Sequence, residues 1–263
     1  MACGSEGREV VTPSSNSDAR SSQLVARGSK LGARSSPLLV SFSGLDGAGK
    51  STQIANLQQF LHRRGFSTRL LAFWDDVVVL SRYRENFVHK VYGSEPGIGA
   101  PGQPVNRRDK NVRKWYLTIL RHGLYLLDAF HLVSVIAAAR KSGADVIIMD
   151  RYIYDELANL PLANAVTRLF VRMIDALVPR PDVAYLLDAD PEEACRRKPE
   201  YPADFMHSCR NSYHRLAHIL GHMTTIPPLP LADAMSAVEG AMLPLLSTRE
   251  HIAAANLDTV GAA

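Results

Sequence analysis

Short apolar runs alternate with longer segments of helical periodicity along most of this 263-residue chain. The apolar runs predict strands at residues 37–42, 67–73, 144–150, 182–187 and 224–226. The segments whose apolar side chains recur every three or four positions predict helices at residues 51–64, 109–142, 163–178, 204–220 and 232–246. Strands that alternate with helices indicate an α/β fold, here a doubly wound, mostly parallel five-stranded sheet with helices on both faces.

Composition separates this patterned region from its flanks. Residues 1–36 contain nine serines and few apolar side chains, which predicts a disordered N-terminal extension. We expect the folded domain at residues 37–250 and a C-terminal tail at residues 251–263. Gly and Pro crowd residues 93–108, which predicts a long loop, and a loop of that length inside a compact domain is often functional.

Charge and cysteine content argue against several classes of protein. The net charge is +4, but residues 1–36 hold five Lys/Arg against three Asp/Glu, so the rest carries only +2 and does not favour nucleic-acid binding. Three cysteines without a C-x-x-C pair favour a reducing compartment. Charged and imidazole side chains interrupt the apolar stretch at residues 119–139, which predicts a buried helix rather than a membrane span. We therefore expect a cytoplasmic protein without nucleic-acid or membrane partners.

One segment carries a specific chemical signal. Residues 43–52 read SGLDGAGKST and contain the pattern G-x-x-x-x-G-K-[ST] between a predicted strand and a predicted helix. In this pattern glycines let backbone N–H groups surround phosphate oxygens, Lys50 reaches the outer phosphates and the Ser51 hydroxyl can ligate Mg²⁺. The helix adds its positive N-terminal end. The expected ligand is a polyphosphate with magnesium. Its predicted contacts are Gly44, Gly47, Ala48, Gly49, Lys50, Ser51 and Thr52.

A second signal lies where another predicted strand ends. Asp150 is the last residue of that strand, and Arg151 follows it directly. The carboxyl ends of parallel strands form the ligand-binding edge of an open sheet, so Asp150 can hold magnesium or its waters and Arg151 can bind a phosphate through two hydrogen bonds. The alternative is a carboxylate that caps the next helix beside a surface arginine.

Three segments together resemble the thymidylate kinases, within the wider nucleoside monophosphate kinases. They are FSGLDGAGKSTQ at residues 42–53, the triplet Asp-Arg-Tyr at 150–152 and YLLDADPEE at 185–193. The order of elements agrees over residues 37–246. The resemblance implies that Asp46 lies near the acceptor sugar and phosphate, that Arg151 holds the acceptor phosphate and that Asp150 lies close to the magnesium.

The resemblance also points to a lid. Gly47 matches the family branch whose catalytic arginine comes from the lid, so Arg196, Arg197 and Lys198 are the lid candidates that would close over the phosphates. The alternative is the solvated face of a helix that begins at Asp190-Pro191. Asp128-Ala129 stands where the family has Asp-Arg, so the arginine that contacts the thymine base is missing. Other candidates for the acceptor site are Arg82, Arg84, Arg107, Arg108, Trp74, Trp115 and Tyr116.

The activity implied by the resemblance is ATP- and Mg²⁺-dependent phosphorylation of a nucleoside monophosphate, with dTMP to dTDP as the leading reaction. Its catalytic cations would be Lys50, Arg151, Arg196 and Arg197. Two alternatives stay open, a P-loop kinase of another small phosphate or hydroxyl acceptor and a nucleotide-gated ATP-binding module. A hydroxyl acceptor would need a catalytic carboxylate, which Asp46, Asp75 or Asp76 could supply. The oligomeric state is left open, a homodimer included.

Three histidines recur at spacing four, at positions 214, 218 and 222. Two imidazoles on one helical face could form a metal pair. No carboxylate or thiol accompanies them at ligand spacing, and Gly221 is expected to end the helix before the third. A polar helix face is therefore the favoured interpretation.

Overall fold

The computed structural model describes residues 36–78, 115–199 and 201–260. The described residues up to His251 belong to one compact unit. The long loop predicted at residues 93–108 lies outside the described residues, as does nearly all of the predicted N-terminal extension. The domain boundaries expected from composition stay a prediction.

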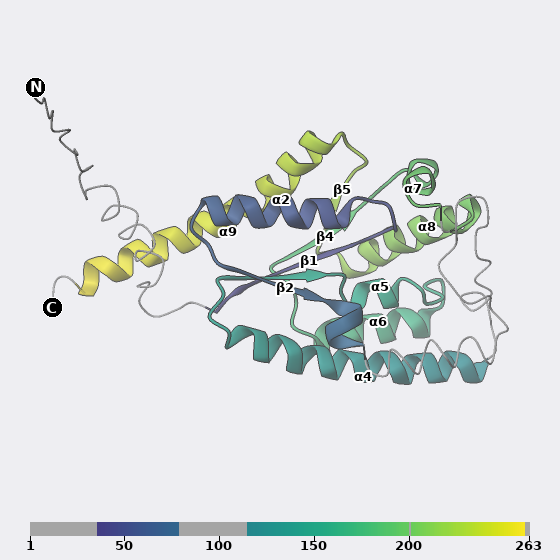
Figure 1. Ribbon diagram of the computed structural model, residues 1–263. Coiled ribbons are helices and arrows are strands. Elements are labelled where there is room, and N and C mark those ends of the chain that lie inside the picture. Colours follow the sequence, from purple (N-terminus) through teal and green to yellow (C-terminus); the bar gives the residue numbers. More distant parts are fainter. Residues whose placement is uncertain (1–35, 79–114, 200, 261–263) are drawn as a thin grey trace, which may run out of the picture. The chain divides into compact units, whose positions relative to one another are not determined.

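One parallel sheet of five strands organises the described part of the chain (Figure 1). The strands are β1 (Leu38–Gly44), β2 (Thr68–Ala72), β3 (Val146–Asp150), β4 (Val183–Leu187) and β5 (Met223–Ile226). Their spatial order is β2-β3-β1-β4-β5, and all four neighbouring pairs are parallel. The predicted five-stranded parallel sheet is confirmed.

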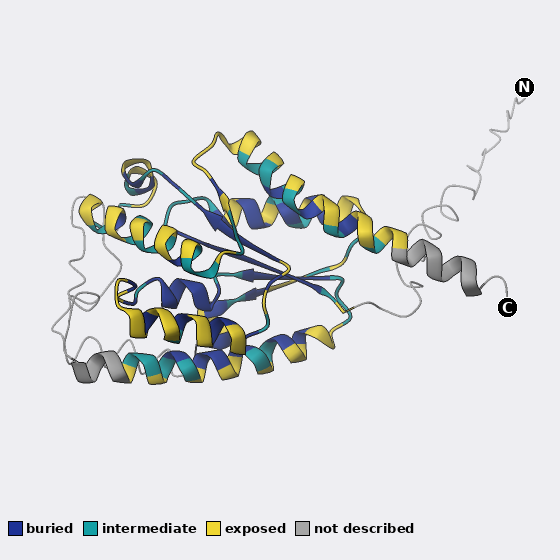
Figure 2. Ribbon diagram, turned by 180° about the vertical axis from the view of Figure 1, so that it is seen from behind, coloured by how far each residue is buried: buried dark blue, intermediate teal, exposed yellow. Residues whose placement is uncertain are grey.

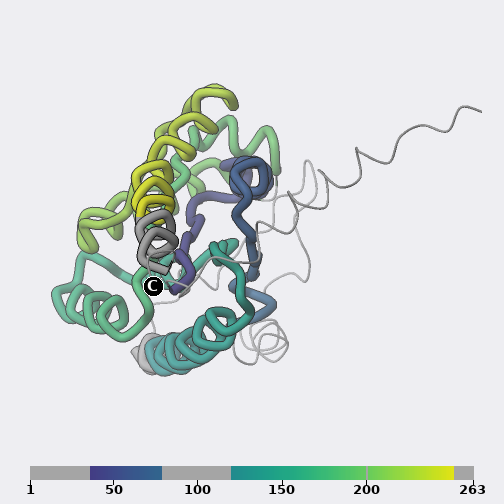
Figure 3. The backbone as a smooth tube through the Cα atoms, turned by 90° about the vertical axis from the view of Figure 1, so that its left-hand side faces the viewer, coloured from purple at the N-terminus to yellow at the C-terminus, as the bar shows by residue number. Residues whose placement is uncertain are grey.

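Helices connect the strands and cover both faces of the sheet, as predicted. They are α2 (Lys50–Arg63), α4 (Trp115–Arg140), α5 (Ile153–Leu157), α6 (Ala165–Leu177), α7 (Pro191–Arg197), α8 (Ala203–Leu220), α9 (Leu231–Val260) and the π-helical turn η1 (Phe73–Val77). Figure 3 shows α2 and α9 on one side of the strands and α4 on the other. The turn η1 and the helix α5 were not predicted. Helix α9 runs past the expected end at residue 246, because no glycine or proline follows until Gly261.

Strand β1 shows how the sheet acquires a core on each face. All seven of its residues are buried, and successive side chains of a strand point to opposite faces. Leu39 joins the core beneath α4, α5 and α6, whereas Val40 and Phe42 join the core beneath α2 and α9. The central strands β1, β3 and β4 are accordingly buried along nearly their whole length, as Figure 2 shows. This double burial explains why the strands read as continuous apolar runs.

Helix α4 buries one of its faces against the sheet. Ala129, Leu132 and Ile136 are fully buried there. By length and composition alone, residues 120–140 form the one described helix that could cross a membrane. Of an apolar stretch of 18 residues in this helix, 33% is buried inside the protein. Because one face of this helix belongs to the core, its apolar character does not indicate a membrane protein.

Candidate functional site

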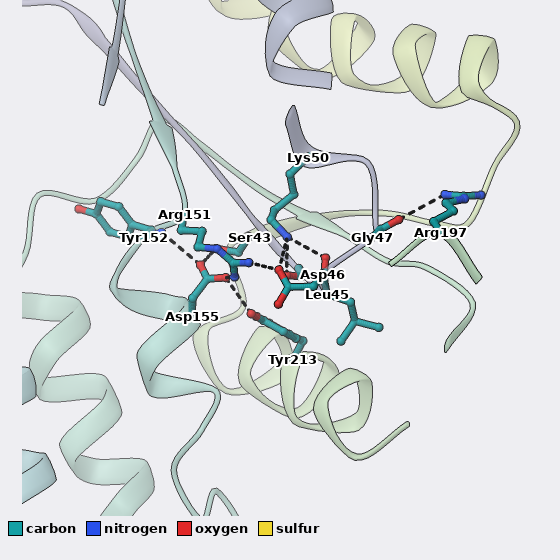
Figure 4. A network of polar contacts seen from close by, with 11 residues as sticks. Ser43, Leu45, Asp46, Gly47, Lys50, Arg151, Tyr152, Asp155, Arg197 and Tyr213 are labelled. Carbon is teal, nitrogen blue, oxygen red and sulfur yellow. Dashed lines mark hydrogen bonds and ion pairs between the residues drawn. The ribbon is translucent and has the colours of Figure 1, made fainter. Parts of the chain in front are cut away.

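The loop between β1 and α2 has the backbone that a phosphate-binding loop requires (Figure 4). Gly44 has a φ of 142°, and a Cβ atom there would lie 2.4 Å from the carbonyl oxygen of Leu187 on β4. A larger residue would therefore push β1 and β4 apart. Gly49, in the left-handed conformation, precedes Lys50, the first residue of α2. The N-terminal end of α2 thus opens at the carboxyl edge of the sheet, where an anion is favoured.

The Lys50 ammonium is buried inside this loop. Its Nζ donates hydrogen bonds to the carbonyl oxygens of Gly44, at 2.9 Å, and Leu45, at 2.7 Å, and lies 4.0 Å from Asp46 Oδ1. Burial, together with the positive charge of Arg151, lowers the pKa of Lys50 to about 8. The proton on this lysine is therefore held less firmly than on an exposed one.

Arg151 lies on the other side of Asp46. Its Nη2 donates to Asp46 Oδ1, and its Nη1 donates to Asp155 Oδ1 at 3.0 Å. Burial alone would raise the pKa of Asp46, but Arg151, Lys50 and Lys198 outweigh burial and hold it below its ordinary value. Burial works against the charge of Arg151, yet Asp155 and Asp46 raise its pKa, so the guanidinium stays charged. Two cations and one carboxylate therefore meet at the loop that sequence analysis singled out.

Two residues that sequence analysis did not single out complete this cluster. Asp155, on α5, is buried, and its Oδ1 also accepts a hydrogen bond from the Tyr213 hydroxyl of α8 at 2.7 Å. Figure 4 shows both side chains below the Arg151 guanidinium. Asp155 follows Arg151 by four residues, the spacing at which opposite charges pair on a helix, and this signal could have found it. No sequence signal marks Tyr213.

Helix α7 packs directly on the P-loop. A Cβ atom at Gly47, which has a φ of 82°, would lie 2.7 Å from the carbonyl oxygen of Ala194 in α7. Arg197 Nη1 reaches the Gly47 carbonyl oxygen at 3.4 Å, and Arg197 Nη2 pairs with Glu193 at 2.8 Å. Arg196 is 76% exposed and lies 4.0 Å from Glu193. The helix does begin at Asp190-Pro191, and one of its cations does touch the P-loop, so the lid role stays a prediction.

The remaining predicted site residues lie at the same edge of the sheet. Asp150 ends β3 beside Phe42 of β1, and its charge acts on Lys50. Ser51 and Thr52 are exposed in the first turn of α2. Trp74, in η1 after β2, is 44% exposed. The structure thus brings the predicted residues to one edge, although their individual roles stay predictions.

The oxygens of Ser51 and Asp150 fit Mg²⁺ in one specific way. The described residues contain no group of three or more His, Cys, Asp or Glu side chains that could hold a metal ion. Mg²⁺ commonly uses one or two protein oxygens, several waters and the oxygens of substrate phosphates. A hydroxyl and a carboxylate beside a phosphate loop therefore suit magnesium that arrives with a nucleotide, not a dedicated protein cage.

Two of the three histidines, His214 of α8 and His222 in the turn after it, have separate partners. His214 lies 3.2 Å from Asp188, which also binds Arg210 through two hydrogen bonds. His222 contacts the Tyr154 hydroxyl at 2.9 Å. Gly221 ends α8 in the left-handed conformation, as expected. These contacts agree with a polar face and give no metal pair among the described residues.

Several known proteins are similar to this chain. A probable thymidylate kinase from Methanosphaera stadtmanae is 23% identical over 202 residues, which cover 75% of this chain and 93% of that protein. The thymidylate kinase of Bifidobacterium longum subsp. infantis is 27% identical over 243 residues, 86% of this chain and 92% of the relative. That of Dehalococcoides mccartyi is 25% identical over 230 residues, with coverages of 81% and 99%. No protein-family model matches the chain.

Because these matches extend over nearly the whole length of the relatives, they concern the entire fold and not the P-loop alone. The similarity to thymidylate kinases over nearly their whole length supports the thymidylate kinase family for this chain. The resemblance drawn from three motifs is thereby confirmed. Among solved structures, thymidylate kinase from Ehrlichia chaffeensis is 17% identical and covers 81% of this chain and 100% of that one, with a TM-score of 0.49.

The resemblance to thymidylate kinases predicts that the residue which reads the base would stand at position 129, where this chain has alanine. Ala129 is fully buried in the core beneath α4. It offers no group to a ligand. Of the other candidates for the acceptor site, Arg82, Arg84, Arg107 and Arg108 lie outside the described residues.

Proposed function

We propose that this protein transfers a phosphoryl group from ATP to a nucleoside monophosphate, with dTMP as the preferred acceptor. One observation carries the proposal: the side chains of Lys50 and Arg151 both lie against Asp46 Oδ1 at the phosphate loop. Two phosphate-binding cations at one carboxylate suit a reaction between two phosphorylated substrates. The names of the relatives that span most of the chain support dTMP as the acceptor.

On the donor side, the loop backbone and Lys50 would bind the ATP phosphates. The Lys50 ammonium now donates to the carbonyl oxygens of Gly44 and Leu45, and phosphate oxygens would replace these acceptors. An anionic ligand favours the charged form of the lysine, so ATP binding would raise the pKa of Lys50, which burial lowers. Lys50 would then follow charge as it moves between the phosphates.

On the acceptor side, Arg151 would hold the monophosphate. Its Nη2 is paired with the partly exposed Asp46, a partner that an incoming phosphate can replace. Asp46 would then be free to contact the acceptor sugar. An acceptor phosphate oxygen is already ionised and nucleophilic, so the reaction requires no general base. Accordingly, the chain needs no catalytic Ser-His or Cys-His pair for this reaction.

Helix α7 would act as the lid. Arg197 already reaches the carbonyl oxygen of Gly47, and Arg196 lies on the same short helix with a largely exposed side chain. A small movement of α7 would bring both guanidinium groups over the β and γ phosphates, where they would stabilise transferred charge and exclude water. Ser51 and Asp150 would hold Mg²⁺, which when bound neutralises phosphate charge.

The experiment that tests the function is a comparison of kcat/KM for dTMP, dUMP, UMP, CMP, AMP and GMP with ATP and magnesium. We expect dTMP to give the highest value, with weaker discrimination than an arginine at position 129 would provide. If a small hydroxyl compound stimulates ADP formation and no monophosphate does, the acceptor assignment is wrong. ATP hydrolysis that no acceptor accelerates would favour a nucleotide-gated module.

Of the carboxylates considered for a hydroxyl acceptor, Asp76 accepts a hydrogen bond from Ala72 N at 2.7 Å and is thereby engaged in η1.

We further propose a homodimer in the cytoplasm. Helix α6 exposes Val166, Leu169 and Met173 in one stripe, the first two at 72% and 70%, and α4 exposes Leu127 and Phe130. The two helices contact one another, and covering their exposed apolar side chains with a second copy would remove apolar area from water. Light scattering should give the mass of a dimer for the parent and of a monomer for Leu169→Glu. A monomeric parent would overturn the assembly, and fractionation of cells tests the location.

A further inference from the structure

We propose that Asp155 is a positioning residue that holds Arg151 ready for the acceptor phosphate. The proposal rests on the function proposed above, since it assigns Arg151 to that phosphate. Asp155 would touch no substrate atom itself. It would act only through the guanidinium that it binds.

The Asp155 carboxylate is held by four donors from different parts of the fold. Oδ1 accepts from Arg151 Nη1 at 3.0 Å and from the Tyr213 hydroxyl at 2.7 Å. Oδ2 accepts from the Ser43 hydroxyl of β1 at 2.6 Å and from Tyr152 N at 3.1 Å. A carboxylate offers about four lone-pair sites, so these bonds use its full capacity. The group therefore has one orientation, and the guanidinium bound to it inherits that orientation.

Arg151 needs such a support because its backbone is unfavourable. Its φ of 67° makes it the one non-glycine residue with positive φ among the described residues. Side chains rarely adopt this conformation, and it persists where the surroundings enforce it, often at a functional site. Arg151 N donates to Phe42 O at 3.0 Å, which fixes the backbone to β1. Asp155 fixes the other end of the residue, the guanidinium.

The two carboxylates that bind Arg151 differ in how readily a ligand can displace them. The Asp46 side chain belongs to the phosphate loop and is 29% exposed, whereas the Asp155 side chain is 1% exposed. An acceptor phosphate can therefore take the place of Asp46 at Nη2 while Asp155 keeps Nη1. Asp155 is thus the permanent arm of the clamp, and Asp46 is the exchangeable one.

The negative charge of Asp155 also permits two cations to share the site. Arg151 lowers the pKa of Lys50, and Asp155 acts in the opposite direction on both cations. Without this charge, the buried ammonium and guanidinium would repel one another more strongly. Asn keeps the shape of the side chain but removes the charge and turns one acceptor into a donor, so it is the appropriate substitution.

The rival explanation is purely structural. Asp155 accepts a hydrogen bond from Tyr152 N, so it also caps the first turn of α5. If this were its only role, Asp155→Asn would lower the melting temperature and the fraction of active protein but leave the KM for the acceptor unchanged. A positioning role predicts a different split among the kinetic constants.

The first experiment measures kcat and both KM values for Asp155→Asn in the full chain, with dTMP and ATP. We expect the KM for dTMP to rise roughly 10- to 100-fold, as for loss of a charge-assisted hydrogen bond, while the KM for ATP changes less than about threefold. Tyr213→Phe, which leaves the Arg151 pair in place, should raise the KM for dTMP by no more than about fivefold.

Asp175→Asn is the matched control, because it removes another buried carboxylate that binds an arginine and a tyrosine. It should leave the KM for dTMP unchanged. Equal acceptor KM values in Asp155→Asn and the parent would overturn the proposal.

If the parent phosphorylates no monophosphate, the proposed function is wrong, and the kinetic constants cannot test the role of Asp155. A second experiment therefore tests the contact between Asp155 and Arg151 directly. The side-chain N–H signals of Arg151 can be followed by NMR in ¹⁵N-arginine-labelled protein and assigned by their loss in Arg151→Lys. In the parent we expect separate, slowly exchanging guanidinium signals, and in Asp155→Asn merged or broadened ones. Identical signals in both proteins would show that Asp155 does not hold the guanidinium.

Discussion

Two buried carboxylates in this molecule have similar partners but lie at different ends of the sheet. Asp155 binds Arg151 and Tyr213 beside the carboxyl ends of β1 and β3. Asp175, at the end of α6, accepts from the Tyr154 hydroxyl at 3.0 Å and from Arg180 at 2.9 Å. His222 joins this second cluster through the Tyr154 hydroxyl. Arg180 precedes β4 and His222 precedes β5, so the cluster lies beside the amino ends of these two strands.

The arginines reveal what separates the two clusters. The Arg151 side chain is 19% exposed and has a backbone conformation that side chains avoid, whereas the Arg180 side chain is 59% exposed and has no such conformation. An exposed ion pair adds little stability, so Arg180 covers its carboxylate at little cost or gain. Arg151 instead concentrates charge and backbone strain beside the phosphate loop. The same residue types therefore join helices to strands in one place and prepare a ligand site in the other.

The largest expected difference comes from Lys50→Ala set against Asp175→Ala. Lys50→Ala should reduce kcat by at least about a thousandfold with little change in melting temperature, because it removes a charge that follows the transferred phosphoryl group and little core volume. Asp175→Ala should take the carboxylate acceptor away from the Tyr154 hydroxyl, whose pKa is raised by burial and by Asp175, and leave His222 as its remaining partner. We expect it to lower the free energy of unfolding by about 1–3 kcal/mol while kcat per folded molecule stays near that of the parent.

Denaturant unfolding and initial-rate assays check this pair. A Lys50→Ala protein that turns over like the parent would remove the P-loop from the proposed reaction. A stable Asp175→Ala protein with low kcat would show that the Asp175 cluster also takes part in the reaction, and would contradict its assignment to a purely structural role.

The next difference is between Arg151→Ala and Arg180→Ala. Arg151→Ala should raise the KM for dTMP roughly 10- to 100-fold and the KM for ATP much less, because the guanidinium is assigned to the acceptor phosphate. Arg180→Ala should change neither constant, since the exposed Arg180 is remote from the phosphate loop in the hydrogen-bond network. Equal losses for ATP and dTMP in Arg151→Ala would contradict the acceptor assignment.

Sequence reasoning succeeded where structure follows from local pattern. All five strands lie within two residues of their predicted bounds, because each is an apolar run between turn residues. The P-loop could be predicted because its spacing by itself defines the chemistry. The family resemblance followed from three short motifs for the same reason.

It failed where side chains distant in sequence meet. Ser43, Asp155 and Tyr213 share hydrogen bonds across separations of 112 and 58 residues, and no periodicity encodes such a contact. The turn η1 was missed because it replaces the polar end of β2 by an unusual helix that depends on Asp76 bonding to Ala72 N. The burial of Ala129 depends on the rotation of α4 against the sheet, which the sequence alone left undetermined.

A smaller effect should connect the lid to the first cluster. Gly47→Ala places a Cβ atom 2.7 Å from the backbone of Ala194, so α7 must move away and Arg197 should lose its contact with the loop. We expect kcat to fall about tenfold, through weaker stabilisation of the transferred charge. Gly65→Ala is the matched control: its φ of 83° imposes the same backbone strain, but nothing lies within 4 Å of the added atom. It should lower the melting temperature and leave kcat unchanged, and a similar kcat in both variants would argue against a lid at α7.

The smallest effect is a pH dependence that belongs to the first cluster alone. Burial lowers the pKa of Lys50 from 10.5 to about 8, so between these values the unfolded chain binds a proton that the folded protein has released. The contribution of Lys50 to the free energy of unfolding therefore rises with pH from 8 to 10.5, and it is constant below 8 because both states are then charged.

ATP requires the charged lysine, so its affinity should follow the opposite trend. We expect the Kd for ATP, measured by calorimetry, to rise roughly 3- to 10-fold between pH 7.5 and 9, with proton uptake on binding at the higher pH. Lys50→Arg should show a flat profile, because a guanidinium keeps its charge over this range. Asp175→Asn should reproduce the profile of the parent. If the Kd of Lys50→Arg rises with pH as steeply as that of the parent, the titrating group is not Lys50, and the charge balance inferred for the Asp46, Lys50 and Arg151 cluster would have to be assigned to another residue.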